Sequence, residues 1–171
     1  MKPFVFCPSC AHRLDKPDHE GGAKCPNCGR VWYRQSAPTA GAVIVKGDKA
    51  LVTVRARDPE KGRIDVPGGF LNAGEHPIDG VKREVNEDLG VAIECDVEDC
   101  ISMATHRYGE GGDFVLALGF RARLISGEPQ ASDDVAAIKW VTKDELDEAD
   151  FAWPHDRELV RKSLEKGEKH G

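Results

Sequence analysis

Three carboxylates crowd one short stretch of the chain, where Glu84, Glu87 and Asp88 occupy positions i, i+3 and i+4. On a helix this spacing places them on one flank, and like charges so close destabilise the helix by a few tenths of a kcal/mol per pair. A neutralising cation is therefore expected. Oxygen ligands that do not form a closed cage suit Mg²⁺ or Mn²⁺, which keep several waters and bridge to substrate phosphates. The alternative interpretation is a solvated acidic helix face.

The sequence around the carboxylates predicts the elements that must position them. Four apolar residues recur at steps of three and four, which at roughly 100° per residue makes one stripe of a helix: Ile78, Val81, Val85 and Leu89. Gly90 suits the end of that helix. Pro67, Gly68 and Gly69 predict a tight loop before it, where the backbone can approach a ligand or metal.

The whole segment from Gly69 to Val91 reads GFLNAGEHPIDGVKREVNEDLGV, or G-x5-E-x7-R-E-U-x-E-D-x-G-U with U aliphatic. This pattern resembles the Nudix box, the signature of hydrolases that cleave a nucleoside diphosphate linked to another group. It departs from the box at one position, where Asp88 replaces a third Glu. The resemblance implies an α/β fold, the Nudix α/β/α sandwich with a mixed sheet, over roughly residues 40–166.

The resemblance also implies roles for the box residues. Glu84, Glu87 and Asp88 are the expected ligands of Mg²⁺ or Mn²⁺, and Glu84 is a candidate for orienting or activating the attacking water. Asp is one methylene shorter than Glu, so Asp88 can reach its metal through a water. In the family, Glu75 and Arg83 pair with each other and hold the loop against the helix, as a bidentate Arg–carboxylate pair can do.

The catalytic base in several branches of the family is an acidic residue of a later loop. Here that loop offers Glu128, Asp133 and Asp134. Asp134 is favoured because it lies just before a predicted strand that ends in Trp140. A solvated acidic turn is the alternative.

Cysteines provide a second signal at the other end of the chain. Two C-x2-C knuckles, separated by fourteen residues, are formed by Cys7, Cys10, Cys25 and Cys28. Four thiolates at about this spacing can close a tetrahedral zinc shell, which leaves no position for water and so predicts a structural metal. A redox pair or a disulfide is the alternative. His12 and His19 lie between the knuckles as substitute ligands.

Composition and charge agree with a compact globular enzyme. The chain has 171 residues, of which 40% are hydrophobic and 32% charged, as in ordinary globular proteins. No apolar run approaches the ~20 residues of a membrane span, and no leader-like segment is evident, so a cytoplasmic protein is expected. The net charge of −6 argues against general nucleic-acid binding, which depends on clustered basic residues.

The cysteine knuckles, the segment QSAPT and the strand and helix patterns after it predict a zinc ribbon over 1–34, a linker over 35–39 and a Nudix domain over 40–171. The ribbon is too small to hold a core without metal. Strands are predicted in a hairpin and then downstream of the box: 41–45, 50–54, 101–105, 114–123 and 135–141. A short helix is predicted over 143–148 and an amphipathic one over about 155–166.

A ribbon joined to a Nudix domain resembles NADH diphosphatases and zinc-ribbon relatives described as ADP-ribose pyrophosphatases. The NADH-cleaving branch carries a stretch resembling SQPWPFPxS downstream of the box, and this chain has none. ADP-ribose or a similar nucleotide sugar is therefore the expected substrate, with NADH or NAD⁺ second. A binding protein for nucleotides or RNA on the same scaffold is the alternative from another class. A homodimer is one expectation, because dimers are common in the resembled family.

Two further groups carry open alternatives. Arg55, Arg57, Lys61 and Arg63 precede the glycine loop and either steer an anionic diphosphate or form an ordinary basic surface loop. Phe151 and Trp153 either stack on a base or pack in the core or a lid.

Overall fold

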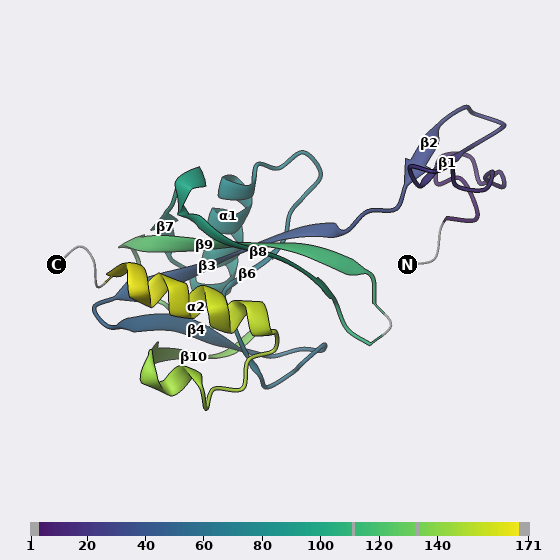
Figure 1. Ribbon diagram of the computed structural model, residues 1–171. Helices are drawn as coiled ribbons and strands as arrows, with labels where there is room; N and C mark the ends of the chain where they lie inside the picture. The colour runs from purple at the N-terminus through teal and green to yellow at the C-terminus, as the bar shows by residue number, and fades with distance from the viewer. Residues whose placement is uncertain (1–3, 111, 133, 168–171) are drawn as a thin grey trace. The chain divides into compact units, whose positions relative to one another are not determined.

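The computed structural model describes residues 4–110, 112–132 and 134–167. The chain divides into two compact units, Met1–Ser36 and Ala37–Gly171 (Figure 1). Strand β3 begins at Ala37, within the segment 35–39 for which the sequence predicts a linker. Within the described residues, no helix is both long and apolar enough to cross a membrane.

The first unit contains a two-stranded antiparallel sheet, β1 (Gly22–Lys24) and β2 (Val31–Tyr33). Its buried cluster is small and includes two of the knuckle cysteines, with Phe4 and Trp32 packed against it: Cys7, Leu14, Ala23 and Cys25. So little apolar surface gives this unit little hydrophobic stabilisation.

The second unit is built on a mixed sheet that has eight strands among the described residues. The strands are β3 (Ala37–Lys46), β4 (Lys49–Arg55), β5 (Ile64–Asp65), β6 (Gly68–Phe70), β7 (Ala92–Glu94), β8 (Cys100–Arg107), β9 (Phe114–Ser126) and β10 (Val135–Thr142). The order is β10-β4-β3-β9-β7, with β5 on β4, β6 on β3 and β8 on β9. Only the β3–β9 pair is parallel among these described strands. The predicted hairpin and the three later strands are confirmed.

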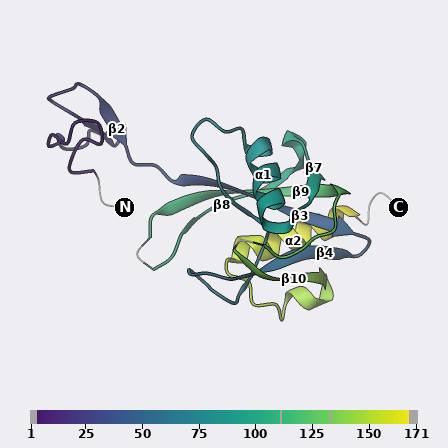
Figure 2. The ribbon, with the colours of Figure 1, turned by 180° about the vertical axis from the view of Figure 1, so that it is seen from behind.

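Two α-helices, α1 (Pro77–Leu89) and α2 (Pro154–Gly167), cover opposite faces of this sheet (Figures 1 and 2). Alternate residues of a strand point to opposite faces. Ala42 and Ile44 accordingly share a buried cluster with the apolar stripe of α1. Val43 shares another with Leu159 and Val160 of α2. The predicted α/β/α sandwich is confirmed.

Helix α1 begins and ends as its sequence predicts. Pro77 opens it, and Nδ1 of His76 accepts a hydrogen bond from the Ile78 amide at 3.3 Å. Gly90 ends it in the left-handed region at φ 67°, which glycine adopts without strain. The predicted stripe residues Val81, Val85 and Leu89 are fully buried, and each contributes roughly 1.5–3 kcal/mol.

The glycine segment before α1 differs from the predicted loop, because Gly68–Phe70 forms strand β6 against β3. Gly68 is required there. It has φ 150°, and a Cβ on it would lie 2.3 Å from the carbonyl oxygen of Ala40. The predicted short helix over 143–148 is a 3-10 turn, η2 (Asp144–Leu146). A further 3-10 turn, η1 (Val97–Asp99), precedes β8.

Candidate active site

Two carboxylates of α1 line a cavity of about 290 Å³ together with the glycines of β6. Asp88 is buried, and its Oδ2 accepts a hydrogen bond of 3.0 Å from the Gly68 amide. The carboxylate of Glu84 lies against Gly69, where a Cβ would come within 2.4 Å of Oε2. The helix and the strand before it thus meet at Glu84 and Asp88.

Arg83 connects Glu75 and Glu87 to Glu84 at the edge of the cavity. Its Nε and Nη2 donate to the two carboxylate oxygens of Glu75, both at 2.8 Å, which is the bidentate pair that the Nudix resemblance implies. Its Nη1 donates to Glu84 at 2.7 Å and to Glu87 at 3.1 Å, and Nη2 also reaches the carbonyl of Phe70 at 3.2 Å. One guanidinium therefore compensates three carboxylates and fastens β6 to α1.

The carboxylates around Arg83 differ in their protonation chemistry. Hydrogen bonds from Arg83 and from the Asn72 amide lower the pKa of Glu75 to about 2. Burial raises the pKa of Glu84, and the hydrogen bond from Arg83 only partly offsets it, because Glu87 and Glu75 add repulsion. Burial of Glu84 thus outweighs its hydrogen bond with Arg83, and a divalent cation at this carboxylate would offset the cost of burying its charge.

Asp134 lines the same cavity as Glu84 and Asp88. Its loop is tied to the end of α1 by a hydrogen bond of 3.0 Å from the Ser132 amide to the Asp88 carbonyl. The Asp134 side chain is half exposed and forms an ion pair of 2.6 Å with Arg57.

The other sequence candidates are placed less centrally. Glu128 is exposed and is not among the cavity-lining residues, and Asp133 lies outside the described residues. Glu75, Arg83 and Glu87 do not line the cavity either, so their link to it runs through the hydrogen bond from Arg83 to Glu84.

The remaining lining includes charged and aromatic residues, of which the sequence singles out Arg55 and Trp153. They lie on β4, on β5, at the end of β8 or just after it, and around the start of α2: Arg55, Asp65, His106, Tyr108, Trp153, His155 and Asp156. Trp153 lies at the cavity, whereas Phe151 is buried in the core. The one local signal for this group is the aromatic and polar density of FAWPHD before α2.

The three arginines among the basic residues before the glycine segment form ion pairs. Arg55 pairs with Asp65 at 2.5 Å, Arg57 with Asp134, and Arg63 with Glu60 and Asp150. These pairs favour a structural role for the three arginines over the steering of a diphosphate.

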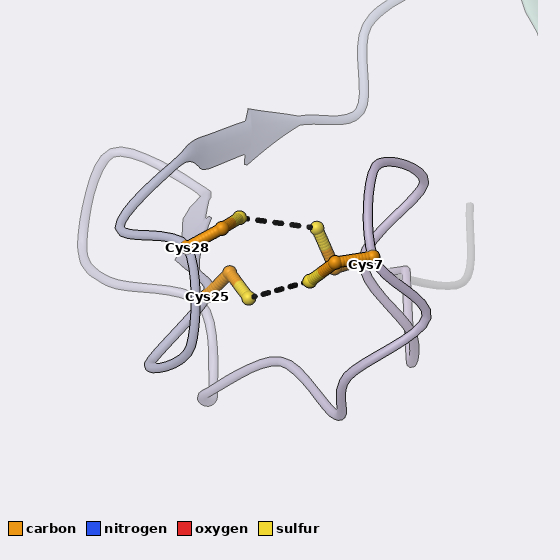
Figure 3. A group of neighbouring side chains, drawn as sticks. Cys7, Cys25 and Cys28 are labelled. Carbon is orange, nitrogen blue, oxygen red and sulfur yellow. Dashed lines mark hydrogen bonds between the residues drawn. The ribbon is translucent and has the colours of Figure 1, made fainter.

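The four knuckle cysteines converge in the first unit, and Figure 3 labels Cys7, Cys25 and Cys28 of this group. All four sulfurs lie within 4.8 Å of one another. The Cys7–Cys28 and Cys10–Cys25 sulfurs are 3.7 and 3.6 Å apart. Four sulfurs at about 2.3 Å from a tetrahedral zinc would be about 3.8 Å apart, so the cluster has the dimensions of a zinc ribbon. Neither His12 nor His19 belongs to it.

Hydrogen bonds favour the thiolate forms of Cys7 and Cys10, whereas burial and the neighbouring thiols raise the pKa of Cys28 to about 11. Burial of the Cys7 thiol raises its pKa, but donors including the Ser9 and Cys10 amides and Nε1 of Trp32 outweigh burial and lower the pKa to about 6. The thiolate is the form that binds metal.

The α1 carboxylates are spread more widely than the cysteines. Across the part of the chain that the structure describes, only the cysteines form a group whose potential ligand atoms all lie within 4.8 Å. Repulsion between the acids and the hold of Arg83 on Glu84 and Glu87 account for the spread. The oxygen-only donor set suits Mg²⁺ or Mn²⁺.

Comparison with known proteins matches residues 35–163 to the NUDIX domain. The chain therefore belongs to the NUDIX family. It is 33% identical over 145 residues to the NAD-capped RNA hydrolase NudC of Pseudomonas aeruginosa, which covers 82% of this chain and 49% of that protein. It spans about half the length of this relative. It is 38% identical over 125 residues to a putative 8-oxo-dGTP diphosphatase 2 of Mycobacterium tuberculosis, covering 69% of this chain and 80% of that protein.

Solved structures agree on the fold. A NUDIX hydrolase from Nitrosomonas europaea superimposes with a TM-score of 0.73 at 18% identity, over 98% of this chain and 94% of that one. An ADP-ribose pyrophosphatase from Streptococcus suis gives a TM-score of 0.59 at 19% identity, over 80% and 96% of the two chains.

Proposed function

We propose that this protein hydrolyses the diphosphate linkage of a nucleoside diphosphate derivative with the help of Mg²⁺ or Mn²⁺. The observation that carries the proposal is the cavity at which Glu84 and Asp88 of α1 meet Gly68 and Gly69 of β6. A bound divalent cation would supply positive charge to the diphosphate oxygens. Membership of the NUDIX family supports the same reaction class.

The chain's own residues have separate parts in this proposal. Glu84, Glu87 and Asp88 hold the cation, while Arg83 and Glu75 keep the helix and β6 in fixed register through their paired hydrogen bonds. Gly68 and Gly69 let the backbone approach the substrate. Asp134 is the proposed base that takes a proton from the attacking water, since it lines the cavity with Glu84 and Asp88.

ADP-ribose is the proposed substrate, cleaved to AMP and ribose 5-phosphate. The support is that this chain lacks a stretch resembling SQPWPFPxS. The presence of such a stretch would favour NADH as the substrate. The second candidate is NAD⁺, NADH or an RNA capped with NAD. It is favoured by the 33% identity to NudC of Pseudomonas aeruginosa. The net negative charge is therefore not sufficient to exclude a capped RNA as the substrate.

A substrate panel separates these candidates. ADP-ribose, NADH, NAD⁺, NAD-capped RNA and 8-oxo-dGTP at equal concentrations, with Mg²⁺ or Mn²⁺, are compared by kcat/KM, where specificity resides. We expect ADP-ribose to give the highest value, with AMP and ribose 5-phosphate as products. A higher value for an NAD-containing substrate would replace ADP-ribose by the second candidate. No turnover of any of them would reject the proposed function.

The residue roles have a matched test. Glu84→Gln should lower kcat by about a hundredfold or more, because it removes a ligand charge and keeps the size. Glu98→Gln changes an exposed glutamate of η1 and should leave kcat unaltered. Asp134→Asn should lower kcat. Arg57→Gln keeps the Asp134 carboxylate and removes the ion pair between the two residues, so it shows how much of the loss comes from the ion pair. Equal losses in Asp134→Asn and Arg57→Gln would count against Asp134 as the base.

For the first unit we propose a structural zinc ion bound by Cys7, Cys10, Cys25 and Cys28. Its support is the match between the sulfur separations and a tetrahedral site. The proposed boundaries remain a ribbon over 1–34 and a NUDIX domain from about residue 40.

A further inference from the structure

The two units of the chain carry net charges of opposite sign. Residues 1–36 contain six Lys or Arg and three Asp or Glu, which gives a net charge of +3. Residues 37–171 contain 18 basic and 27 acidic residues, which gives a net charge of −9. The total of −6 therefore conceals a small basic unit, and positive charge attracts polyanionic partners. The negative charge of the whole chain thus does not describe the surface of the first unit.

The β1–β2 sheet of the first unit has a buried face and an outer face. Alternate residues of a strand point to opposite faces. Ala23 and Trp32 are register partners and pack in the small buried cluster of this unit. The residues on either side of them form the opposite face, here called the β1–β2 outer face: Gly22, Lys24, Val31 and Tyr33. The three that have side chains are exposed, so this face is accessible to a ligand.

The ring of Tyr33 rests on the backbone of Gly22. A Cβ on that glycine would come within 2.8 Å of Cε1 and 3.0 Å of Cζ of the ring, and within 2.8 Å of Cγ1 of Val31. Gly22 is accordingly buried, whereas Tyr33 is 47% exposed. The lack of a side chain at residue 22 thus leaves room for the ring. An exposed ring that the backbone already holds in place is preorganised to receive a planar group.

Basic residues accompany this ring on the strands and at their ends. Lys24 lies on the same face as Tyr33, and Arg30 and Arg34 flank β2. Arg30 donates to the hydroxyl of Ser9 at 2.6 Å, and this neutral partner leaves its charge in place. The acidic residues of the unit all precede β1 in the sequence, and the Asp18 carboxylate accepts two backbone hydrogen bonds of 2.9 Å there.

An exposed ring beside cations matches the chemistry of a single-stranded nucleic acid. Its bases present flat faces that stack on aromatic side chains, and its phosphates are attracted to Lys and Arg. In a duplex the bases are stacked on one another, so the ring finds no free face. A protein partner would use the apolar groups of Val31 and Tyr33, but only a polyanion also gains from the net charge of +3. The charge therefore favours a nucleic acid as the occupant.

We propose that the β1–β2 outer face binds a single-stranded RNA, with one base stacked on Tyr33 and a phosphate at Lys24. Gly22 is a positioning residue, because it lets the ring rest on the strand. DNA shares this chemistry, and RNA is assigned because the second candidate substrate under the proposed function is a capped RNA. The face itself needs no cleavage of a diphosphate and so goes beyond the proposed hydrolysis. It does require the first unit to be folded around its proposed zinc ion.

Binding of a fluorescently labelled RNA dodecamer to the full chain, followed by anisotropy, tests the face. The RNA carries a 5′-hydroxyl, so it offers no diphosphate to cleave. We expect it to bind about tenfold or more tighter than the same sequence in a duplex, and than an abasic strand of equal length, which keeps the phosphates and lacks the bases. Tyr33→Leu should weaken RNA binding about tenfold, as loss of one stacking contact does, and Tyr33→Phe should keep most of it.

Salt dependence tests the phosphate contact separately. For a single strand, each phosphate neutralised by a cation contributes about −0.7 to the slope of log K against log salt concentration. Lys24→Gln should therefore make this slope shallower by about 0.7. The matched control is Lys139→Gln, which changes an exposed lysine of β10 in the acidic second unit and should leave the slope unaltered. An unaltered slope in Lys24→Gln would remove the phosphate from this residue and overturn the assignment.

Zinc content shows that a variant retains its first unit. Tyr33→Leu with about one zinc per chain and wild-type affinity for RNA would overturn the proposal, as would equal affinity for the abasic strand. A DNA dodecamer that binds tenfold tighter than the RNA would overturn the choice of RNA. Self-association that depends on Tyr33, seen by sedimentation in the absence of RNA binding, would assign the face to a second copy of the chain instead. If Tyr33→Leu loses zinc, the salt slope of Lys24→Gln decides.

Turnover separates this proposal from the proposed function. Tyr33→Leu should leave kcat/KM for ADP-ribose unchanged, because Tyr33 does not line the cavity of Glu84 and Asp88. RNA binding that depends on Tyr33 without hydrolysis of any substrate would reject the proposed function and keep the RNA site. Hydrolysis by a chain that does not bind RNA would do the reverse.

Discussion

Gly69 lies so close to Glu84 that a Cβ on the glycine would come within 2.4 Å of Oε2 and 2.7 Å of Cδ. The atoms in the way are the end of a flexible side chain, so Gly69→Ala should move Glu84 and leave the fold intact. A displacement of about 1 Å at a catalytic group can cost about a hundredfold. We expect kcat to fall by about 10–100-fold with a nearly unchanged Tm.

The neighbouring glycine is the matched comparison. A Cβ at Gly68 would lie 2.3 Å from the Ala40 carbonyl oxygen, and its φ of 150° strains any other residue. Gly68→Ala should therefore lower Tm as well as activity. Wild-type kcat in Gly69→Ala would show that the position of Glu84 is not critical.

Glu87 tests whether a carboxylate outside the cavity lining still serves as a ligand. Its side chain is half exposed and bonded to Arg83. Glu87→Gln keeps the size and removes the charge, so we expect hydrolysis to fall by about a hundredfold, mainly in kcat, with the fold retained. Near-normal turnover at limiting Mg²⁺ would remove Glu87 from the ligand set.

The pair of Glu75 and Arg83 predicts a pH dependence of stability. Folding lowers the pKa of Glu75 from its ordinary 4.5 to about 2. The stabilisation is therefore fully present above about pH 4.5 and is lost as pH falls through about 2. Glu75→Gln should lower Tm at pH 7, and the difference from wild type should shrink between pH 4.5 and 2. A difference in Tm that is constant over this range would show that the charge of Glu75 is not responsible.

Asp156 predicts the opposite trend, because its folded pKa is raised above the ordinary 3.8. Above that pH the unfolded chain releases a proton that the folded chain retains, so the wild type loses stability as pH rises toward the folded pKa. Asp156→Asn keeps a donor for Asp65 without this cost. Its Tm relative to wild type should rise by about 2–4 °C or more between pH 4 and 8. A flat result for Asp156→Asn would mean that Asp156 is ionised in the folded protein.

The carboxylate corner of the site follows from local sequence, whereas its aromatic part does not. Glu84, Asp88 and Gly69 belong to one continuous segment, and the burial of Val81, Val85 and Leu89 fixes the face of α1 that they share. The aromatic residues of the cavity, such as His106, Tyr108 and Trp153, are different, because they meet only through strand pairing and the packing of α2. No local spacing records such contacts.

Backbone pairing also explains why β3 begins at Ala37, ahead of the predicted strand over 41–45. Ala37 and Pro38 have the composition of a linker, but they pair with Val115 and Leu116 of β9. Thr39 pairs with both Ala117 of β9 and Phe70 of β6. Tertiary hydrogen bonds outweigh local propensity at this end of β3.

The zinc proposal gives the last prediction. The sulfur of Cys25 is fully buried in a unit whose apolar core is small, so loss of the metal should release the structure of residues 1–34. Freshly purified, reduced protein should contain about one zinc per chain. Cys25→Ser should lose the zinc and make the first unit sensitive to protease, whereas Cys100→Ser, outside the cluster, should keep both zinc and resistance. Absence of zinc from the wild-type protein on elemental analysis would refute the assignment, because four thiols this close would then need another explanation, such as a disulfide pair.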